Sequence, residues 1–139
     1  MPPALSAVKW VDLPTKRDNR GSLTIVSQTE VPFAIARLFY LYGMDSLVSR
    51  GGHAHRVTEQ LVVPVAGRFV LDLTDGRKTE SFVMENPARG IYVPPMIWDH
   101  LHEFSSEAVC LVIASTQYSE SDYIRNWEEF LAIRGYAQP

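Results

Sequence analysis

The chain has 139 residues, the usual size of one folded domain. Hydrophobic residues make up 46% of it and charged residues 21%, which excludes intrinsically disordered and collagen-like chains. The formal net charge is −3 at pH 7 and no basic stripe is visible, so a nucleic-acid partner is not expected. No apolar stretch approaches the roughly 20 residues of a membrane span. We therefore expect a single domain over residues 1–139 that does not associate with a membrane.

Predicted strands dominate the first 114 positions, as short apolar runs separated by turn residues. In chain order, they cover residues 7–11, 22–27, 33–42, 61–65, 68–73, 81–84, 90–93 and 108–114. Turns are predicted at residues 18–21, 66–67 and 75–76, and the Asp-Gly pair of the third is a strong hairpin signal. So many short strands predict an all-β sandwich or barrel. Pro64 inside a strand predicts an edge position or a bulge.

The C-terminal part alone shows helical spacing of its apolar residues. We expect a helix over residues 122–132, with Ser119 or Ser121 as its N-cap and Gly135 after its end. Its aromatic stripe would pack on a sheet.

The single cysteine, Cys110, lies inside an apolar run from Val109 to Ile113. One cysteine cannot form an internal disulfide, and this setting favours an inert core thiol over a nucleophile. The N-terminus lacks the basic flank and apolar core of a signal peptide. These features predict a cytoplasmic protein.

His53 and His55 follow two glycines in the string Arg50-Gly51-Gly52-His53-Ala54-His55. On a strand, residues two apart point to the same face, so the two imidazoles would project together. Neighbouring imidazoles can bind a metal or share acid–base work near neutral pH. The structural alternative is a pair of surface histidines at the start of a strand.

A second alternating pair, His100 and His102, follows Asp99 in the string 98–102. The structural alternative here is an edge strand with polar residues facing water. The order of the first histidine pair, Glu59, a glycine and a later polar residue resembles that of cupin barrels. In cupins the two histidines, the glutamate and a later histidine usually hold a divalent metal. Asp99 takes the place of that later histidine, and although a carboxylate can ligate, this departure makes a metal less expected.

The chain most closely resembles one cupin family, the sugar nucleotide 3,4-ketoisomerases, over about residues 8–131. The motifs that carry the resemblance are Arg20-Gly21-Ser22-Leu23, Pro32-Phe33-x-Ile35-x-Arg37-x-x-Tyr40, Arg50-Gly51-x-His53-Ala54-His55, Glu59-Gln60, Asp75-Gly76, Pro87-Ala88-x-Gly90-x-Tyr92-Val93 and Ser121-Asp122-Tyr123-Ile124-Arg125. The resemblance implies a jelly-roll cupin barrel, a homodimer with exchanged N-terminal strands, and no metal or other cofactor. It implies an isomerase that moves the ketone of dTDP-4-keto-6-deoxyglucose from C4 to C3, in a route to 3-amino-3,6-dideoxy sugars of surface glycans or antibiotics.

The implied reaction needs a base near pH 7 and hydrogen-bond donors aimed at the sugar oxygens. The base removes the proton on C3, next to the ketone, and an enediol(ate) forms across C3 and C4. We expect His55 to be this base and His53 to donate to an oxygen or relay a proton, because histidine titrates near neutral pH. The resemblance supports the pair as catalytic without dividing the steps between them.

Five residues are expected to contact the substrate: Arg20, Arg37, Tyr40, Arg50 and Asp99. Arginine binds phosphate through a planar fork, which suits the diphosphate. Arg37 lies in an apolar strand, where a charge is costly unless it is paired. Strand alternation places Arg37 and Tyr40 on opposite faces, so both line one cavity only if a bulge intervenes.

The configuration at C4 of the product stays open, because family members form either galacto or gluco products. The two positions that track this choice correspond to Arg20, which resembles the galacto-forming members, and Asp99, which resembles neither type. Two other functions also stay open. One is a metal-dependent cupin enzyme with His53, His55, Glu59 and either Asp99 or His100 around the ion. The other is a sugar nucleotide binding protein without catalysis.

Overall fold

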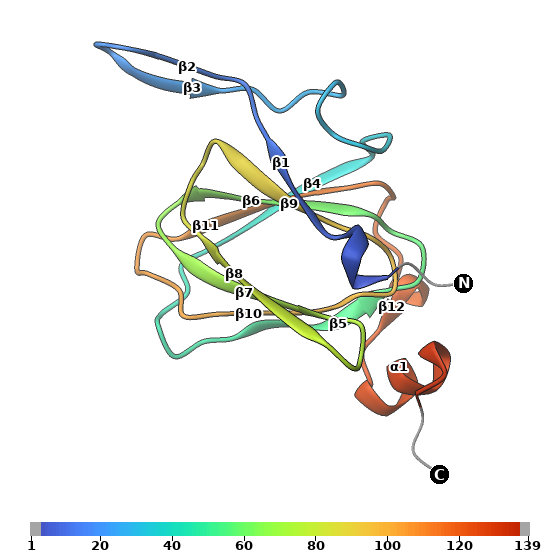
Figure 1. Ribbon diagram of the computed structural model, residues 1–139. Coiled ribbons are helices and arrows are strands. Elements are labelled where there is room, and N and C mark those ends of the chain that lie inside the picture. Colours follow the sequence, from blue (N-terminus) through green and yellow to red (C-terminus); the bar gives the residue numbers. More distant parts are fainter. Residues whose placement is uncertain (1–3, 137–139) are drawn as a thin grey trace.

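The computed structural model describes residues 4–136 and consists mainly of two five-stranded antiparallel sheets with a short C-terminal helix (Figure 1). One sheet has the order β1-β9-β6-β11-β4, and the other has the order β12-β5-β10-β7-β8. The strands are β1 (Lys9–Asp12), β2 (Thr15–Asp18), β3 (Gly21–Thr24), β4 (Arg37–Tyr42), β5 (Arg50–His55), β6 (Gln60–Ala66), β7 (Phe69–Thr74), β8 (Thr79–Met84), β9 (Arg89–Val93), β10 (Trp98–His102), β11 (Val109–Ala114) and β12 (Tyr123–Ile124). The predicted all-β, cupin-like fold with a C-terminal helix is confirmed.

The main core lies between the two sheets. Leu71 and Leu73 of β7 are almost fully buried and pack in one cluster with Ile91 of β9 and Val112 of β11. Cys110 belongs to the same cluster, and burial raises the pKa of its thiol to about 12. The prediction of an inert core thiol is therefore supported, since a thiol with that pKa stays protonated at neutral pH.

Pro64 marks a bulge, as one of the two sequence-based alternatives predicted. The register of β6 against β11 shifts there, because Cys110 pairs with Pro64 whereas Val109 pairs with Ala66, and Val65 is the extra residue. The other alternative, an edge position, is wrong because β6 lies between β9 and β11. The β9 pairing ends at Val62, so no ladder hydrogen bond is lost at the proline.

The strand predicted over residues 33–42 begins later, at Arg37. The side-chain amide of Gln28 donates to the carbonyl of Phe33 and accepts from the backbone N–H of Ile35 at 3.0 Å. These bonds satisfy backbone groups that would otherwise need a strand partner. Phe33 lies in a loop and its side chain is buried, so its apolar character reflects core packing and does not indicate a strand.

The N-terminal elements differ in extent from the prediction. Leu5–Ala7 is a 3₁₀ turn before β1, and the strand predicted over residues 22–27 is the shorter β3. β3 pairs with β2, which the sequence did not predict, across the predicted turn at residues 18–21. Figure 1 shows this β2–β3 hairpin extending away from the two main sheets.

The predicted helix over residues 122–132 is wrong in its start. Helix α1 spans Trp127–Arg134, and its N-cap is Asn126, whose side chain accepts from the backbone N–H of Glu129 at 2.8 Å. The residues before it form a 3₁₀ turn and β12, which pairs with β5. Gly135 ends the helix in the left-handed conformation, as predicted. Within the described residues, no helix is long and apolar enough to cross a membrane.

Candidate active site

A cavity of about 250 Å³ lies between the two sheets. Its apolar wall is formed by Phe39, Leu41, Val62, Leu71, Val93, Leu101 and Val112. Its polar groups are Arg50, His53, Gln60, Asp99, Tyr123 and Arg125. An apolar cavity with a few converging polar groups is the usual form of a small-molecule site.

Both histidines of β5 point toward the interior between the sheets. Ala54, between them in sequence, is fully buried on the other face, in a cluster with Ile124 and Phe130. The rings of His53 and His55 have centroids 5.2 Å apart and are almost perpendicular. The expectation that alternation brings these imidazoles together is confirmed.

A bulge in β5 sets the position of His53. Asp99 of β10 pairs with His53, whereas His100 pairs with Gly51, so Gly52 is the extra residue. Gly51 and Gly52 both have positive φ. A Cβ on Gly51 would lie only 2.4 Å from Oδ1 of Asp99. The glycine therefore gives the aspartate room beside the histidine.

His55 is buried and engaged at both ring nitrogens. Nδ1 lies 2.8 Å from Oδ2 of Asp122, and Nε2 lies 3.2 Å from the side-chain amide nitrogen of Gln60. A carboxylate only accepts and the amide nitrogen only donates, so Nδ1 carries the proton and Nε2 accepts. Burial lowers the pKa of His55 and outweighs the hydrogen bond to Asp122, which acts to raise it. His55 is therefore held neutral in one tautomer.

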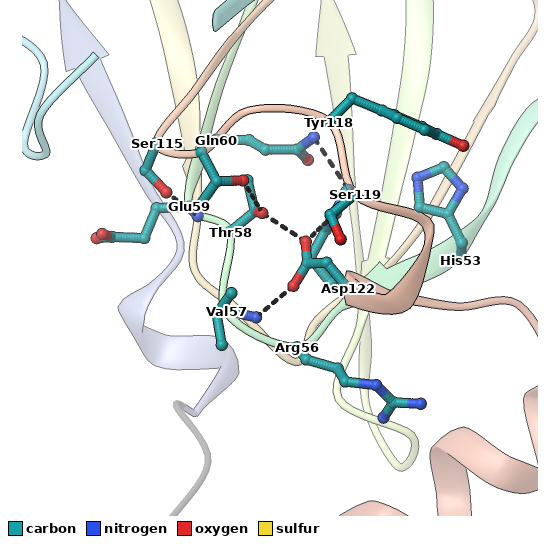
Figure 2. Close-up of polar contacts among 12 residues, drawn as sticks. His53, Arg56, Val57, Thr58, Glu59, Gln60, Ser115, Tyr118, Ser119 and Asp122 are labelled. Atoms are coloured by element: carbon teal, nitrogen blue, oxygen red, sulfur yellow. Dashed lines mark hydrogen bonds and ion pairs between the residues drawn. The ribbon is translucent and has the colours of Figure 1, made fainter. Parts of the chain in front are cut away.

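Asp122 is fixed in turn by the segment that follows β5 (Figure 2). Its oxygens accept from the hydroxyl of Thr58 at 2.5 Å and from the backbone N–H of Val57 at 2.8 Å. Partial burial acts to raise the pKa of Asp122, but these hydrogen bonds outweigh it and the pKa is lowered. Sequence reasoning assigned Asp122 no role beyond its place in a motif, because 67 positions separate it from His55 and only the fold brings them together.

His53 lines the cavity directly and faces Asp99. Its Nε2 lies 3.6 Å from Oδ2 of Asp99. Burial raises the pKa of Asp99, and the charge of His53 opposes this shift. Nδ1 of His53 and Oδ1 of Asp99 are buried without a hydrogen-bond partner among the described residues. A bound ligand with polar groups could satisfy both atoms.

Tyr123 and Arg125 are two further members of the site to which the sequence assigned no role. The ring of Tyr123 lies 5.0 Å from that of His53 and 4.4 Å from that of His55, between centroids. The guanidinium of Arg125 lies 4.3 Å above the Tyr123 ring and donates to Glu120 at 2.7 Å. Both residues come from the segment between β11 and α1. Part of this segment was predicted to be helical, but its strand β12 pairs with β5.

The predicted substrate contacts are only partly brought together. Arg50 and Asp99 line the cavity. Arg37 lies outside its wall, with its guanidinium 5.3 Å from the ring of Phe39, but its charge is close enough to contribute to the lowered pKa of His55.

Two predicted contacts do not reach the cavity of their own chain. Tyr40 is 62% exposed on the outer face of β4 beside Tyr42, because alternation turns Phe39 inward instead. Arg20 is exposed on the β2–β3 hairpin, where it forms an ion pair with Asp18 at 2.6 Å.

The ligand set of a metal-dependent cupin is not assembled. Glu59 accepts a hydrogen bond from the hydroxyl of Tyr92 at 2.6 Å, and Figure 2 shows its carboxylate directed away from His53. His100 lies on the opposite face of β10 from Asp99. No group of metal-ligating side chains in residues 4–136 includes His53 or His55.

Comparison with known proteins gives the family. Residues 6–135 match the family model described as "FdtA: WxcM-like, C-terminal". The chain belongs to this family. The TDP-4-oxo-6-deoxy-alpha-D-glucose-3,4-oxoisomerase of Aneurinibacillus thermoaerophilus is 39% identical over 114 residues, which are 81% of this chain and 82% of that protein.

Solved structures of 3,4-ketoisomerases share the fold over nearly the whole chain. A 3,4-ketoisomerase from Helicobacter canadensis has a TM-score of 0.89 and 36% identity, covering 92% of this chain and 97% of that one. A histidine-to-asparagine variant of the 3,4-ketoisomerase QdtA from Thermoanaerobacterium thermosaccharolyticum, in complex with TDP-4-keto-6-deoxyglucose, has a TM-score of 0.91 and 27% identity, covering 94% and 96%. The resemblance to sugar nucleotide 3,4-ketoisomerases is confirmed, and these relatives are isomerases.

Proposed function

We propose that this FdtA-like chain converts dTDP-4-keto-6-deoxyglucose into a dTDP-3-keto-6-deoxyhexose. The observation that carries the proposal is a pair of neighbouring imidazoles, with His53 in the cavity wall and His55 behind it, held neutral by Asp122 and Gln60. The known activities of the relatives, and the substrate bound to the QdtA variant, support this choice of reaction.

The reaction moves protons and leaves the oxidation state of the sugar as a whole unchanged. A base takes the proton from C3, and the electron pair of that bond forms a C3–C4 double bond while O4 gains a proton. C4 then accepts a proton as the hydroxyl on C3 loses its own, and the ketone ends on C3. Proton carriers and donors suffice for each step, which is the work that imidazoles perform near neutral pH. We therefore propose that the reaction needs no metal.

His53 is the better candidate for the group that exchanges protons with the sugar. It lines the cavity, and its Nδ1 has no hydrogen-bond partner among the described residues. His55 lies behind it with both nitrogens engaged, which suits a positioning and relay role. This division reverses the expectation that His55 is the base, because the sequence showed the pairing of the two rings but not their different surroundings.

The size of the cavity indicates where the nucleotide lies. Sites for drug-sized ligands enclose about 300–1,000 Å³, so a cavity of about 250 Å³ suits the hexose and not a whole nucleotide sugar. The diphosphate would then lie at the cavity mouth, within reach of cationic side chains such as Arg50 and Arg125.

We propose a homodimer in which the β2–β3 hairpin of one chain packs on its partner. The outer face of β4 carries Leu38, Tyr40 and Tyr42, all more than half exposed, and Leu23 of the hairpin is 57% exposed. Burying such a face is favourable, and an exchanged hairpin would protect the edge strand β4. The exchange would also bring Arg20 toward the partner's cavity mouth, which would explain why Arg20 lies far from its own.

Three finer points are likewise proposals from the sequence. The chain is expected to act in the cytoplasm, in a route to 3-amino-3,6-dideoxy sugars of surface glycans or antibiotics. Asp99 would influence how C4 is reprotonated, because its carboxylate lies beside the ring of His53 in the cavity wall. The configuration at C4 of the product, galacto or gluco, stays open, and the NMR couplings of the proton on C4 distinguish the two.

The direct test is to incubate the purified full-length chain with dTDP-4-keto-6-deoxyglucose and to identify the sugar product by NMR. A 3-keto product supports the proposal. Binding of the substrate without conversion would favour the non-catalytic binding protein. Conversion that stops with EDTA and returns with a divalent metal would favour the metal-dependent enzyme.

A further inference from the structure

A second cluster of titratable side chains lies on the outer face of the barrel. In β10, Asp99 and Leu101 are buried, so His100 and His102 point outward. Their rings stack with centroids 4.9 Å apart and an interplanar angle of 25°. On the adjacent strand β7, Asp72 pairs directly with His100 in the register. Three potential metal ligands therefore share one face of two neighbouring strands.

The ligand atoms of this cluster are already close together. Oδ2 of Asp72 lies 2.7 Å from Nε2 of His102 and 3.7 Å from Nδ1 of His100. One ligand atom from each of the three residues can be chosen so that all lie within 4.8 Å of one another. Atoms that share a tetrahedral zinc ion at bond lengths of 2.0–2.1 Å are about 3.3 Å apart, so small side-chain rotations suffice. Paired strands supply a rigid base for such a site.

His102 lies between two carboxylates. A neutral imidazole has a single N–H group, so it cannot donate a hydrogen bond to both. Its Nε2 faces Asp72 at 2.7 Å and its Nδ1 faces Glu103 at 3.1 Å. Carboxylates only accept, and a neutral ring donates only one proton. The second contact therefore needs another proton or a metal ion. A carboxylate behind the ring is the usual partner of a metal-bound histidine, because it fixes the tautomer that leaves the opposite nitrogen free to ligate.

Asp72 is likewise prepared to act as a ligand. Its Oδ1 accepts from the hydroxyl of Ser81 on β8 at 2.6 Å, which orients the carboxylate. This bond to Oδ1 leaves Oδ2 directed at the two histidines.

We propose that His100, His102 and Asp72 bind one divalent transition-metal ion of the zinc class, with water completing the coordination. Two imidazoles and one carboxylate suit zinc and similar divalent transition metals, whereas calcium and magnesium prefer oxygen ligands. The ion would join β7 to β10 on the face opposite the cavity. It is therefore a structural site that takes no part in proton transfer to the sugar, and it stands whether or not the isomerase proposal does.

The test is a titration of the chelator-treated full chain with zinc, in which calorimetry measures the binding. We expect one zinc per chain, and an affinity lowered at least about tenfold by either His102→Gln or Asp72→Asn. Asp75→Asn, which replaces a partly buried carboxylate just after β7, is the matched control and should bind zinc as the parent does. Equal affinity in the parent and both cluster variants would overturn the proposal, as would loss of binding in His53→Gln.

A second measurement reports the ligands themselves. Copper(II) added at one equivalent should give an EPR spectrum with two imidazole nitrogens, and His100→Gln should reduce this to one. Circular dichroism of the metal-free variants shows whether they are folded, so a weak signal is not confused with unfolding. A spectrum that does not change in His100→Gln would place the copper elsewhere and contradict the site.

Discussion

At the scale of single residues, His53 and His55 differ in their surroundings although they are neighbours on one face of β5. His53 is in the cavity wall, with a ring nitrogen that has no hydrogen-bond partner within residues 4–136, whereas His55 is buried and bonded to Asp122 and Gln60. A proton carrier needs access to the substrate, and a positioning group needs fixed partners. We therefore propose that the two histidines serve different roles, which their surroundings determine.

Replacing each histidine by asparagine separates these roles. His53→Asn should lower kcat by about 10²–10⁴-fold with a nearly unchanged KM, because it removes a proton carrier. His55→Asn should lower kcat less, since an amide nitrogen can still donate to Asp122. Steady-state kinetics on dTDP-4-keto-6-deoxyglucose measure both. A larger loss of kcat in His55→Asn would show that the roles are the other way round.

The lowered pKa of His55 also predicts a pH dependence of stability. As the pH falls below about 6.5, His55 takes up a proton in the unfolded chain before it does so in the folded chain, so the free energy of unfolding falls. Asp122, whose lowered pKa acts below about 3.8, contributes outside this window. Urea unfolding at pH 7.5 and 5.5 should show a smaller loss in His55→Asn than in the parent. Equal losses would contradict the buried, neutral state of His55.

At the scale of elements, the bulge in β5 connects backbone conformation with the site. Gly51 and Gly52 both have positive φ, but only Gly51 lies against Asp99. Gly51→Ala and Gly52→Ala should each cost about 1–3 kcal/mol in backbone strain. Gly51→Ala should cost a further 1–3 kcal/mol or so, because its methyl group forces the Asp99 carboxylate to move. Urea unfolding of the matched pair measures the difference, and equal losses would argue against a tight contact at Gly51.

The elements also show how far local sequence determines structure here. Alternation was enough to predict that His53 and His55 share a face, because that pattern is a local property of strands. The same rule placed Arg37 and Tyr40 on opposite faces of one strand, and in the structure Phe39 lines the cavity whereas Tyr40 does not. The helix start and the β4 start were misplaced because Asn126 and Gln28 make side-chain bonds to backbone that apolar spacing does not reveal. Asp122 could be assigned only from the fold.

At the scale of the whole molecule, the β2–β3 hairpin is the element least explained by one chain alone. It extends from the two sheets (Figure 1) and carries Arg20 away from the cavity of its own chain. A dimer that exchanges this hairpin would bury exposed apolar side chains and would deliver a cation to the partner's diphosphate site. The oligomeric state and the function of Arg20 are then linked.

Arg20→Ala tests this link, with Arg17→Ala on the same hairpin as the matched control. Loss of a charge-assisted contact to phosphate costs about 1.5–3 kcal/mol, so KM should rise about 10–100-fold in Arg20→Ala while the protein stays dimeric by light scattering. Arg17→Ala should leave KM nearly unchanged. A monomeric parent protein, or equal effects of the two variants, would contradict the exchanged hairpin.

We propose that this cavity moves a ketone by acid–base chemistry alone. Proton NMR of EDTA-treated protein with dTDP-4-keto-6-deoxyglucose in deuterated buffer tests it most directly. The expected result is a 3-keto product that carries deuterium at C4, because the proton carriers of the cavity exchange with solvent. Unchanged substrate in the presence of folded, EDTA-treated protein would contradict it.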